Sequence, residues 1–106
     1  MLGYAMTYYN LGVSYYWGAG GDEKPDKKKG RSFYELAARN GDVKAIHNLG
    51  SIEGDTGNHH RAFKYYLTSA KAGFKASMDA VKKAFTNGGY GITKDEYEST
   101  LAAYQK

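Results

Sequence analysis

Cysteine is absent from the 106-residue sequence, and proline occurs once, at position 25. Without cysteine the chain has neither a disulfide framework nor thiol chemistry, although this leaves its cellular compartment open. Because proline interrupts helix interiors, its scarcity permits long helices. No stretch of 18 apolar residues occurs, so we expect no membrane-spanning helix. Residues 1–13 have no Lys or Arg ahead of their apolar part, which is not typical of a signal peptide; the default expectation for location is cytoplasmic.

Glycine and tyrosine are abundant instead, with 14 and 11 residues. In a helical chain, many glycines indicate frequent helix ends or close contacts between helices. Tyrosine supplies a large ring with a polar tip, which suits both a core and a binding face. Hydrophobic residues make up 42% and charged residues 25% of the chain, as in ordinary folded proteins. A chain of this length forms one domain at most.

Two short patterns recur along the chain. A Leu-Gly pair stands at positions 11–12 and again at 49–50, and the pattern Tyr-x-x-x-Ala-x-x-Gly stands at 34–41 and again at 66–73. A weaker third copy begins at position 73. Self-similarity at a spacing of a few tens of residues is the signature of a repeat protein. We therefore expect a single array with repeats near 3–40, 41–72 and 73–106, the last of them degenerate.

Apolar residues within each repeat recur at helical spacing. For example, Ala45, Ile46, Leu49 and Ile52 form one apolar stripe, which predicts an amphipathic helix. The fold class that follows is an all-α solenoid of about three antiparallel helix pairs. Its helices are predicted near 4–17, 26–40, 42–54, 59–72, 74–87 and 94–105.

The predicted helix ends carry recognisable capping residues. Gly41 and Gly73 follow helices as left-handed caps would. Asn58 stands where its side chain would cap the next helix. Thr93 and Glu96 have the spacing of a capping box.

Glycine also occurs inside two of the predicted helices. Gly12 and Gly50 hold equivalent places in their repeats, although glycine within a helix costs about 1 kcal/mol relative to alanine. We interpret both as points where a facing helix approaches closely. The leucines and tyrosines of the recurring patterns would fill the space around them.

Together these features resemble the Sel-1-like repeats, which are relatives of the tetratricopeptide repeats. The first repeat shows the fullest set, namely Leu11-Gly12, Tyr15, Gly18-Ala19-Gly20, Asp26, Tyr34, Ala37-Ala38 and Gly41. The second repeat departs from the pattern, because Glu53 stands where an aromatic residue is expected and the turn at 54–57 is short. The degenerate third repeat is typical of a terminal repeat, whereas the first helix is apolar on nearly all sides. We therefore expect the chain to be a fragment of a longer array.

The resemblance implies a non-catalytic scaffold or adaptor that binds a protein or peptide in a concave groove, lined by the first helix of each pair. The residues that would face this groove are Tyr9, Val13, Tyr16, Trp17, Lys44, His47, Ser51 and Lys83. Aromatic side chains dominate binding energies at interfaces, so Tyr9, Tyr16 and Trp17 are the expected anchors. The lysines favour an acidic partner segment.

Catalytic, cofactor-binding and metal-binding residues are not indicated by any pattern. The adjacent His59 and His60 would point about 100° apart on a helix, so both cannot face one ion. Neither cysteine nor a carboxylate stands at a recognised ligand spacing from them. The acidic residues Asp22, Glu23 and Asp26 lie in a lysine-rich loop, and solvated carboxylates make poor catalysts.

The basic run from Lys27 to Arg31 leaves an alternative function open. With a net charge of +4 for the chain, this run is able to contact the phosphates of a nucleic acid. However, a nucleic-acid surface usually gathers basic residues with few acids between them, and acidic residues stand beside this run. A protein partner is therefore favoured over nucleic acid.

Overall fold

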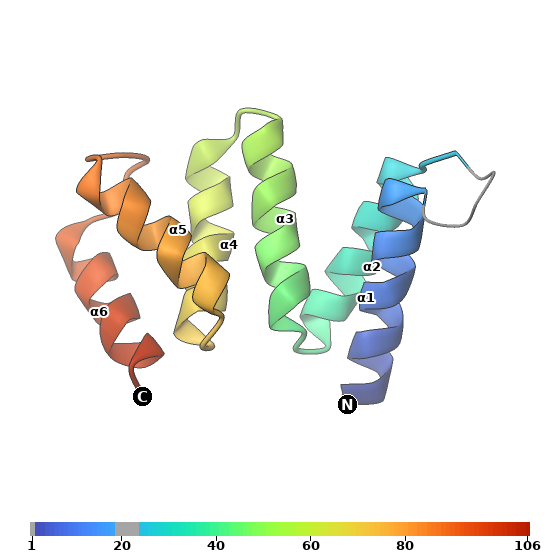
Figure 1. Ribbon diagram of the computed structural model, residues 1–106, viewed down its shortest axis with the longest axis horizontal. Coiled ribbons are helices and arrows are strands. Elements are labelled where there is room, and N and C mark those ends of the chain that lie inside the picture. The colour runs from blue at the N-terminus through green and yellow to red at the C-terminus, as the bar shows by residue number, and fades with distance from the viewer. Residues whose placement is uncertain (1, 19–23) are drawn as a thin grey trace. The chain divides into compact units, whose positions relative to one another are not determined.

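The computed structural model describes residues 2–18 and 24–106. All regular secondary structure in these residues is helical, which confirms the predicted all-α class. The six helices are α1 (Leu2–Trp17), α2 (Lys27–Arg39), α3 (Val43–Asp55), α4 (His59–Lys71), α5 (Lys75–Thr86) and α6 (Lys94–Tyr104) (Figure 1). Each boundary lies within two residues of its prediction. Part of the Gly-x-Gly loop at 18–20 lies outside the described residues, and so do the acidic residues Asp22 and Glu23.

The chain divides into two compact units, Met1–Ala45 and Ile46–Lys106. Unit 1 contains α1, α2 and the first residues of α3. Unit 2 contains the rest of α3 together with α4, α5 and α6. Each unit has buried side chains of its own and is described by itself.

In unit 1, helices α1 and α2 pack closely because glycines face aromatic residues. A methyl group on Gly12 would lie 2.7 Å from ring carbon Cδ1 of Tyr34. A methyl group on Gly30 would lie 2.5 Å from the backbone nitrogen of Tyr16. Both distances are far too short for real carbon contacts, so the two helices fit together only with glycine at these positions. The buried apolar residues of the unit are Ala5, Tyr16, Tyr34, Ala37 and Ala45.

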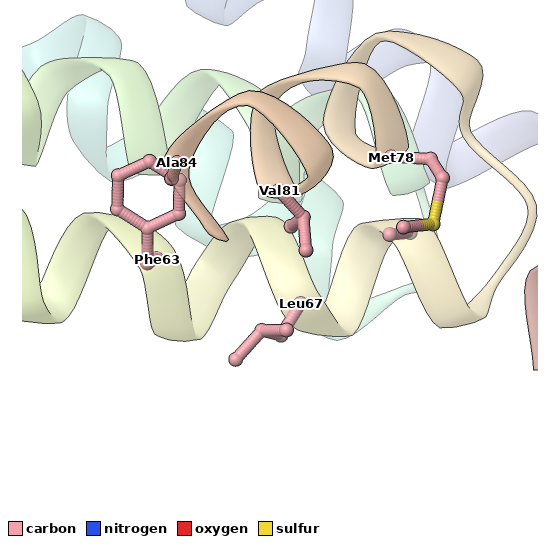
Figure 2. Packing of buried hydrophobic residues seen from close by; sticks show 6 residues of the cluster. Phe63, Leu67, Met78, Val81 and Ala84 are labelled. Carbon is pink, nitrogen blue, oxygen red and sulfur yellow. The ribbon is translucent and has the colours of Figure 1, made fainter. Parts of the chain in front are cut away.

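In unit 2, the core lies between α4 and α5. It consists of Phe63, Leu67, Ala70, Met78, Val81 and Ala84 (Figure 2). Helix α6 adds its partly buried face to this cluster, and the rings of Phe85 and Tyr97 stack there with centroids 4.3 Å apart. The last helix is therefore joined to the core by an aromatic contact.

The part of α3 that belongs to unit 2 meets α4 through the second predicted glycine contact. A methyl group on Gly50 would lie 2.8 Å from Cε1 of Tyr66 and 3.0 Å from the carbonyl oxygen of Ala62. Leu49, beside this glycine, is buried. The contact of Gly50 with Tyr66 repeats that of Gly12 with Tyr34, as the recurring sequence pattern predicts.

Most helix ends also follow their predicted signals. Gly41 and Gly73 have left-handed φ angles of 92° and 99°. Thr93 and Glu96 form the predicted capping box: the Glu96 N–H donates to Thr93 Oγ1 at 3.1 Å, and the Thr93 N–H donates to Glu96 Oε1 at 3.0 Å. Hydrogen bonding to Thr93, above all from its backbone, lowers the pKa of the Glu96 carboxyl.

The predicted side-chain cap at Asn58 is wrong. Asn58 is the residue before α4, but its side chain accepts no hydrogen bond from an amide of that helix. Its Nδ2 instead donates to Oε2 of Glu53 at 3.0 Å. Because a buried carboxylate requires donors, the Asn58 amide is turned toward Glu53 and away from the helix start.

The contact at Gly50 generates the first testable prediction. Gly50→Ala should lower the free energy of unfolding, because the added methyl group collides with the Tyr66 ring and the Ala62 carbonyl. Overpacking of this kind costs about 1–3 kcal/mol. Urea denaturation of the purified chain measures the change.

The matched control is Gly54→Ala, one turn further along α3. A methyl group there would meet only Cβ of Ala62, at an ordinary 3.8 Å. Its effect should be neutral or stabilising, by up to about 1 kcal/mol from helix propensity. Equal effects of the two substitutions would show that the α3–α4 contact does not depend on glycine.

Candidate partner-binding surfaces

On α1, the predicted anchor residues separate into buried and exposed side chains. Tyr16 is only 8% exposed, and its ring packs on Tyr34 with centroids 6.0 Å apart. Tyr9, two turns earlier on the same face, is half-buried against the same ring at 5.9 Å. Trp17 is 63% exposed, because a step of one residue turns its side chain by about 100°. Tyr16 therefore serves the core, and we do not retain it as a partner-binding residue.

Val13 and Lys44 complete the predicted surface of unit 1. Val13 is half-buried on α1 and Lys44 is exposed. The ammonium group of Lys44 lies 5.3 Å from the centroid of the Tyr9 ring, within the range of a cation–π contact. Tyr9 and Lys44 thus lie together within this unit.

The basic run of α2 contacts aromatic rings of its own unit. The Lys29 ammonium lies 4.5 Å from the centroid of the Tyr15 ring, and that of Lys27 lies 5.5 Å from the Tyr16 ring. Tyr15 in turn stacks on Phe33 at 5.5 Å. Two of the charges considered for nucleic-acid binding are therefore also engaged in intramolecular cation–π contacts.

In unit 2, His47 and Ser51 tie α3 to its neighbours. His47 Nδ1 lies 2.6 Å from Oγ of the buried Ser77, and the His47 ring packs against Tyr66 and Phe74. Ser51 Oγ lies 3.0 Å from the Tyr66 hydroxyl. Burial lowers the pKa of the His47 imidazole below its usual 6.5. His47 therefore has a structural role that the sequence pattern did not reveal.

A cleft of about 560 Å³ opens between α3, α4, α5 and the loop that follows α5. Two predicted residues, Ser51 and Lys83, lie on its wall. Small residues make up much of the lining, namely Gly54, Ala62, Ala80, Ala84 and Gly89. Aromatic rings make up most of the rest, namely His59, Phe63, Tyr66 and Tyr90. Sequence reasoning missed Tyr90, for which the only signal is its place in a glycine-rich segment.

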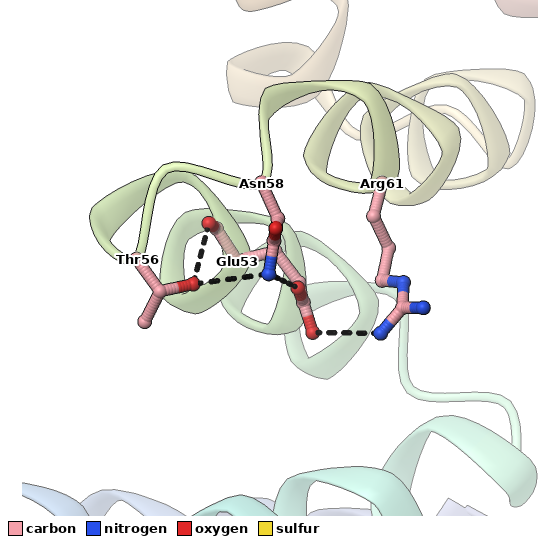
Figure 3. Close-up of polar contacts among 4 residues, drawn as sticks. All are labelled: Glu53, Thr56, Asn58 and Arg61. Atoms are coloured by element: carbon pink, nitrogen blue, oxygen red, sulfur yellow. Dashed lines mark hydrogen bonds and ion pairs between the residues drawn. The ribbon is translucent and has the colours of Figure 1, made fainter.

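Glu53 closes the turn between α3 and α4 by means of its buried side chain, which is 2% exposed. Figure 3 shows Asn58 and Arg61 reaching its two carboxylate oxygens, at 3.0 Å and 3.8 Å. The Glu53 carbonyl accepts a further hydrogen bond from Thr56 Oγ1 at 2.9 Å. The sequence marked Glu53 only as a departure from the repeat pattern, whereas the structure makes it the polar centre of this turn.

The described residues contain no group of three or more His, Asp or Glu side chains arranged to hold a metal ion. Within residues 2–18 and 24–106, no helix combines the length and the apolar character that crossing a membrane requires.

Repeated helix pairs joined by glycine–tyrosine contacts define a helical repeat protein. The family model of the Sel1 repeat matches residues 5–42 and 43–74, which is more than half of the chain. The chain belongs to the Sel1 repeat family. Repeats of this family are generally helical modules for protein interaction. Neither a curated protein nor a solved structure matches the chain.

Glu53 generates the second prediction. Glu53→Ala should lower the free energy of unfolding by about 1–3 kcal/mol, because the carboxylate no longer accepts the hydrogen bond from Asn58. Glu53→Gln retains an acceptor for Asn58 and should cost less. Arg61→Ala should cost no more than about 1 kcal/mol, because the guanidinium is largely exposed. Chemical denaturation ranks the three variants, and a loss in Arg61→Ala as large as in Glu53→Ala would contradict this assignment.

His47 generates a prediction about pH. Because its pKa is lowered in the fold, the unfolded chain takes up a proton near pH 6.5 that the folded chain accepts only at lower pH. The free energy of unfolding should therefore fall as the pH drops below 6.5, and this loss should level off below the folded-state pKa. In His47→Gln this part of the pH dependence should vanish. Urea denaturation of both proteins across this pH range measures it, and identical profiles would rule out the role of His47.

Proposed function

We propose that this chain is a non-catalytic scaffold or adaptor that binds a peptide or protein segment along the first helices of its pairs. The observation that carries the proposal is the cleft of unit 2. It is open, lined by small and aromatic residues, and bordered by Ser51 on α3 and Lys83 on α5. Concave, largely apolar surfaces with a few polar groups are the usual form of binding sites.

In unit 1 the corresponding surface consists of Tyr9, Val13, Trp17 and Lys44. Lys44 lies beside the half-buried Tyr9 ring, and Trp17 is exposed. Aromatic side chains and a cation on one surface are suited to a partner that carries both apolar and acidic groups. Trp17 supports this assignment most strongly, since it is largely exposed and only one edge-on contact, with the Tyr16 ring at 4.9 Å, is recorded between its ring and another aromatic ring of the described residues. We treat α5 and α6, residues 73–106, as a degenerate third repeat that supplies one wall of the cleft.

Nucleic-acid binding through Lys27–Arg31 is the alternative function. Lys27 and Lys29 already contact tyrosine rings of their own unit, and no observation specifically favours a phosphate ligand. A steep loss of affinity for generic RNA with rising salt, abolished by replacing these lysines, would support this alternative instead.

The test uses the purified chain as bait for binding proteins and compares it with a variant in which a tryptophan side chain fills the cleft. Ala80 lines the cleft on α5, and Ala76, on the same helix, is exposed and lies outside the cleft lining. Each protein that the bait captures is purified, and its direct binding to the purified chain is confirmed. Binding of such a protein should be lost with Ala80→Trp and retained with Ala76→Trp. Thermal unfolding of both variants establishes that the fold persists. Equal binding by the two variants would refute the cleft as the binding site.

A further inference from the structure

Tyr90 stands out in the loop between α5 and α6 because its backbone is left-handed, with φ of 66°. Bulky residues rarely adopt this conformation, and strained residues of this kind gather at ligand clamps. Gly88 and Gly91, on either side, have φ angles of 69° and 75°. The strain does not serve to bury the ring, since Tyr90 is 49% exposed.

The Tyr90 ring belongs to an aromatic wall. It stacks on Phe63 with centroids 5.1 Å apart and planes 6° apart, and it lies 4.8 Å from the His59 ring. Phe63 contacts Tyr66 edge-on at 5.1 Å. Residues 59, 63 and 66 share one face of α4, because they are spaced by four and three positions. Tyr90 therefore extends an aromatic stripe of α4 from outside that helix.

The wall on α5 has the opposite character. It presents Ala80 and Ala84 to the cleft, together with the polar Lys83 and Asn87. An aromatic wall facing a wall of small residues leaves room for a flat, bulky side chain. The volume of about 560 Å³ falls within the range of ligand-binding clefts.

The α5 side of the cleft carries a positive charge and the α3 side a negative one. Lys83 on α5 is exposed and forms no ion pair within the described part of the chain, whereas Lys75 on the same helix is paired with Asp79 at 2.8 Å. Asp55 borders the cleft from α3. An acidic group of a bound segment is therefore attracted toward α5 and repelled from α3.

We propose, resting on the function above, that Tyr90 is an aromatic clamp of this cleft. Its occupant is an extended peptide segment that inserts one aromatic side chain between Tyr90 and the alanines of α5 and places a neighbouring carboxylate at Lys83. Tyr90 sets the preference for an aromatic side chain, and Lys83 sets the preference for the adjacent acid.

The probes are three short Gly/Ser peptides that carry a central Trp-Glu, Trp-Lys or Ala-Glu pair. Amide chemical shifts of the isotope-labelled chain report where each peptide binds. The Trp-Glu peptide should shift the amides of Phe63, Lys83 and Tyr90, and both other peptides should bind more weakly. Lys83→Glu should abolish the preference for Trp-Glu over Trp-Lys, whereas Lys82→Glu, whose side chain is outside the cleft lining, should preserve it.

Tyr90→Gly tests the clamp itself. It should weaken binding of the Trp-Glu peptide about tenfold, the equivalent of one lost aromatic contact, while Tyr90→Phe retains the wild-type affinity. Glycine adopts the left-handed backbone without strain, which offsets the lost ring contacts, so Tyr90→Gly should remain folded. The unfolding midpoint confirms this.

Three results would overturn the clamp. One is equal affinity for the Trp-Glu and Ala-Glu peptides, and another is unchanged binding by Tyr90→Gly. The third is the absence of shifts at the cleft, whether the peptide binds elsewhere, such as near Trp17 or on a second copy of the chain, or does not bind. Binding near Trp17 would leave the proposed interaction function standing. If Ala80→Trp bound the captured proteins as well as Ala76→Trp did, the cleft would be refuted as the binding site in both proposals.

Discussion

The close approach of a helical glycine to a tyrosine ring is the contact on which the pairs α1–α2 and α3–α4 depend. Gly12 receives the ring of Tyr34, and Gly50 receives that of Tyr66. A helix gives up stability to contain a glycine, by about 1 kcal/mol relative to alanine, and the buried or partly buried ring offsets this loss. The same contact places functional groups, because it directs the Tyr66 hydroxyl to Ser51 and brings the Tyr66 ring beside His47.

The helix pairs α1–α2 and α3–α4 carry different residues three positions after Gly12 and Gly50, and these residues make different contacts with the second helix of each pair. In unit 1, Tyr15 stacks on Phe33 and lies beneath the Lys29 ammonium. In unit 2, Glu53 accepts a hydrogen bond from Asn58 and pairs with Arg61. One solution uses aromatic stacking and the other a buried carboxylate with donors around it. A buried charge is tolerated only with such donors, so the short turn of the second repeat must supply them.

The helices and their contacts were readable from the sequence because their signals are local. Apolar stripes and the Thr93–Glu96 capping box depend on residues within a few turns of each other, and the Gly and Tyr positions are recognised because they recur from one repeat to the next. The site was less readable. The first helix is apolar on nearly all sides, so no polar stripe indicated that Tyr16 points inward while Trp17 points outward. Asn58 was misassigned because the burial of Glu53 is a tertiary property. The glycines around Tyr90 indicate a turn and nothing of its left-handed backbone, which the surrounding fold imposes.

The fit of glycine to tyrosine also constrains how such repeats diverge. A larger residue in place of Gly50 requires a smaller or displaced ring in place of Tyr66, so neither position is free to change alone. The two positions should therefore covary among related repeats, and each helix pair should be inherited as a unit. Duplication or deletion of a whole pair preserves every such contact, whereas a breakpoint between the two helices separates the glycine from its ring. Changes in repeat number are consequently the least disruptive way for an array of this kind to alter its length.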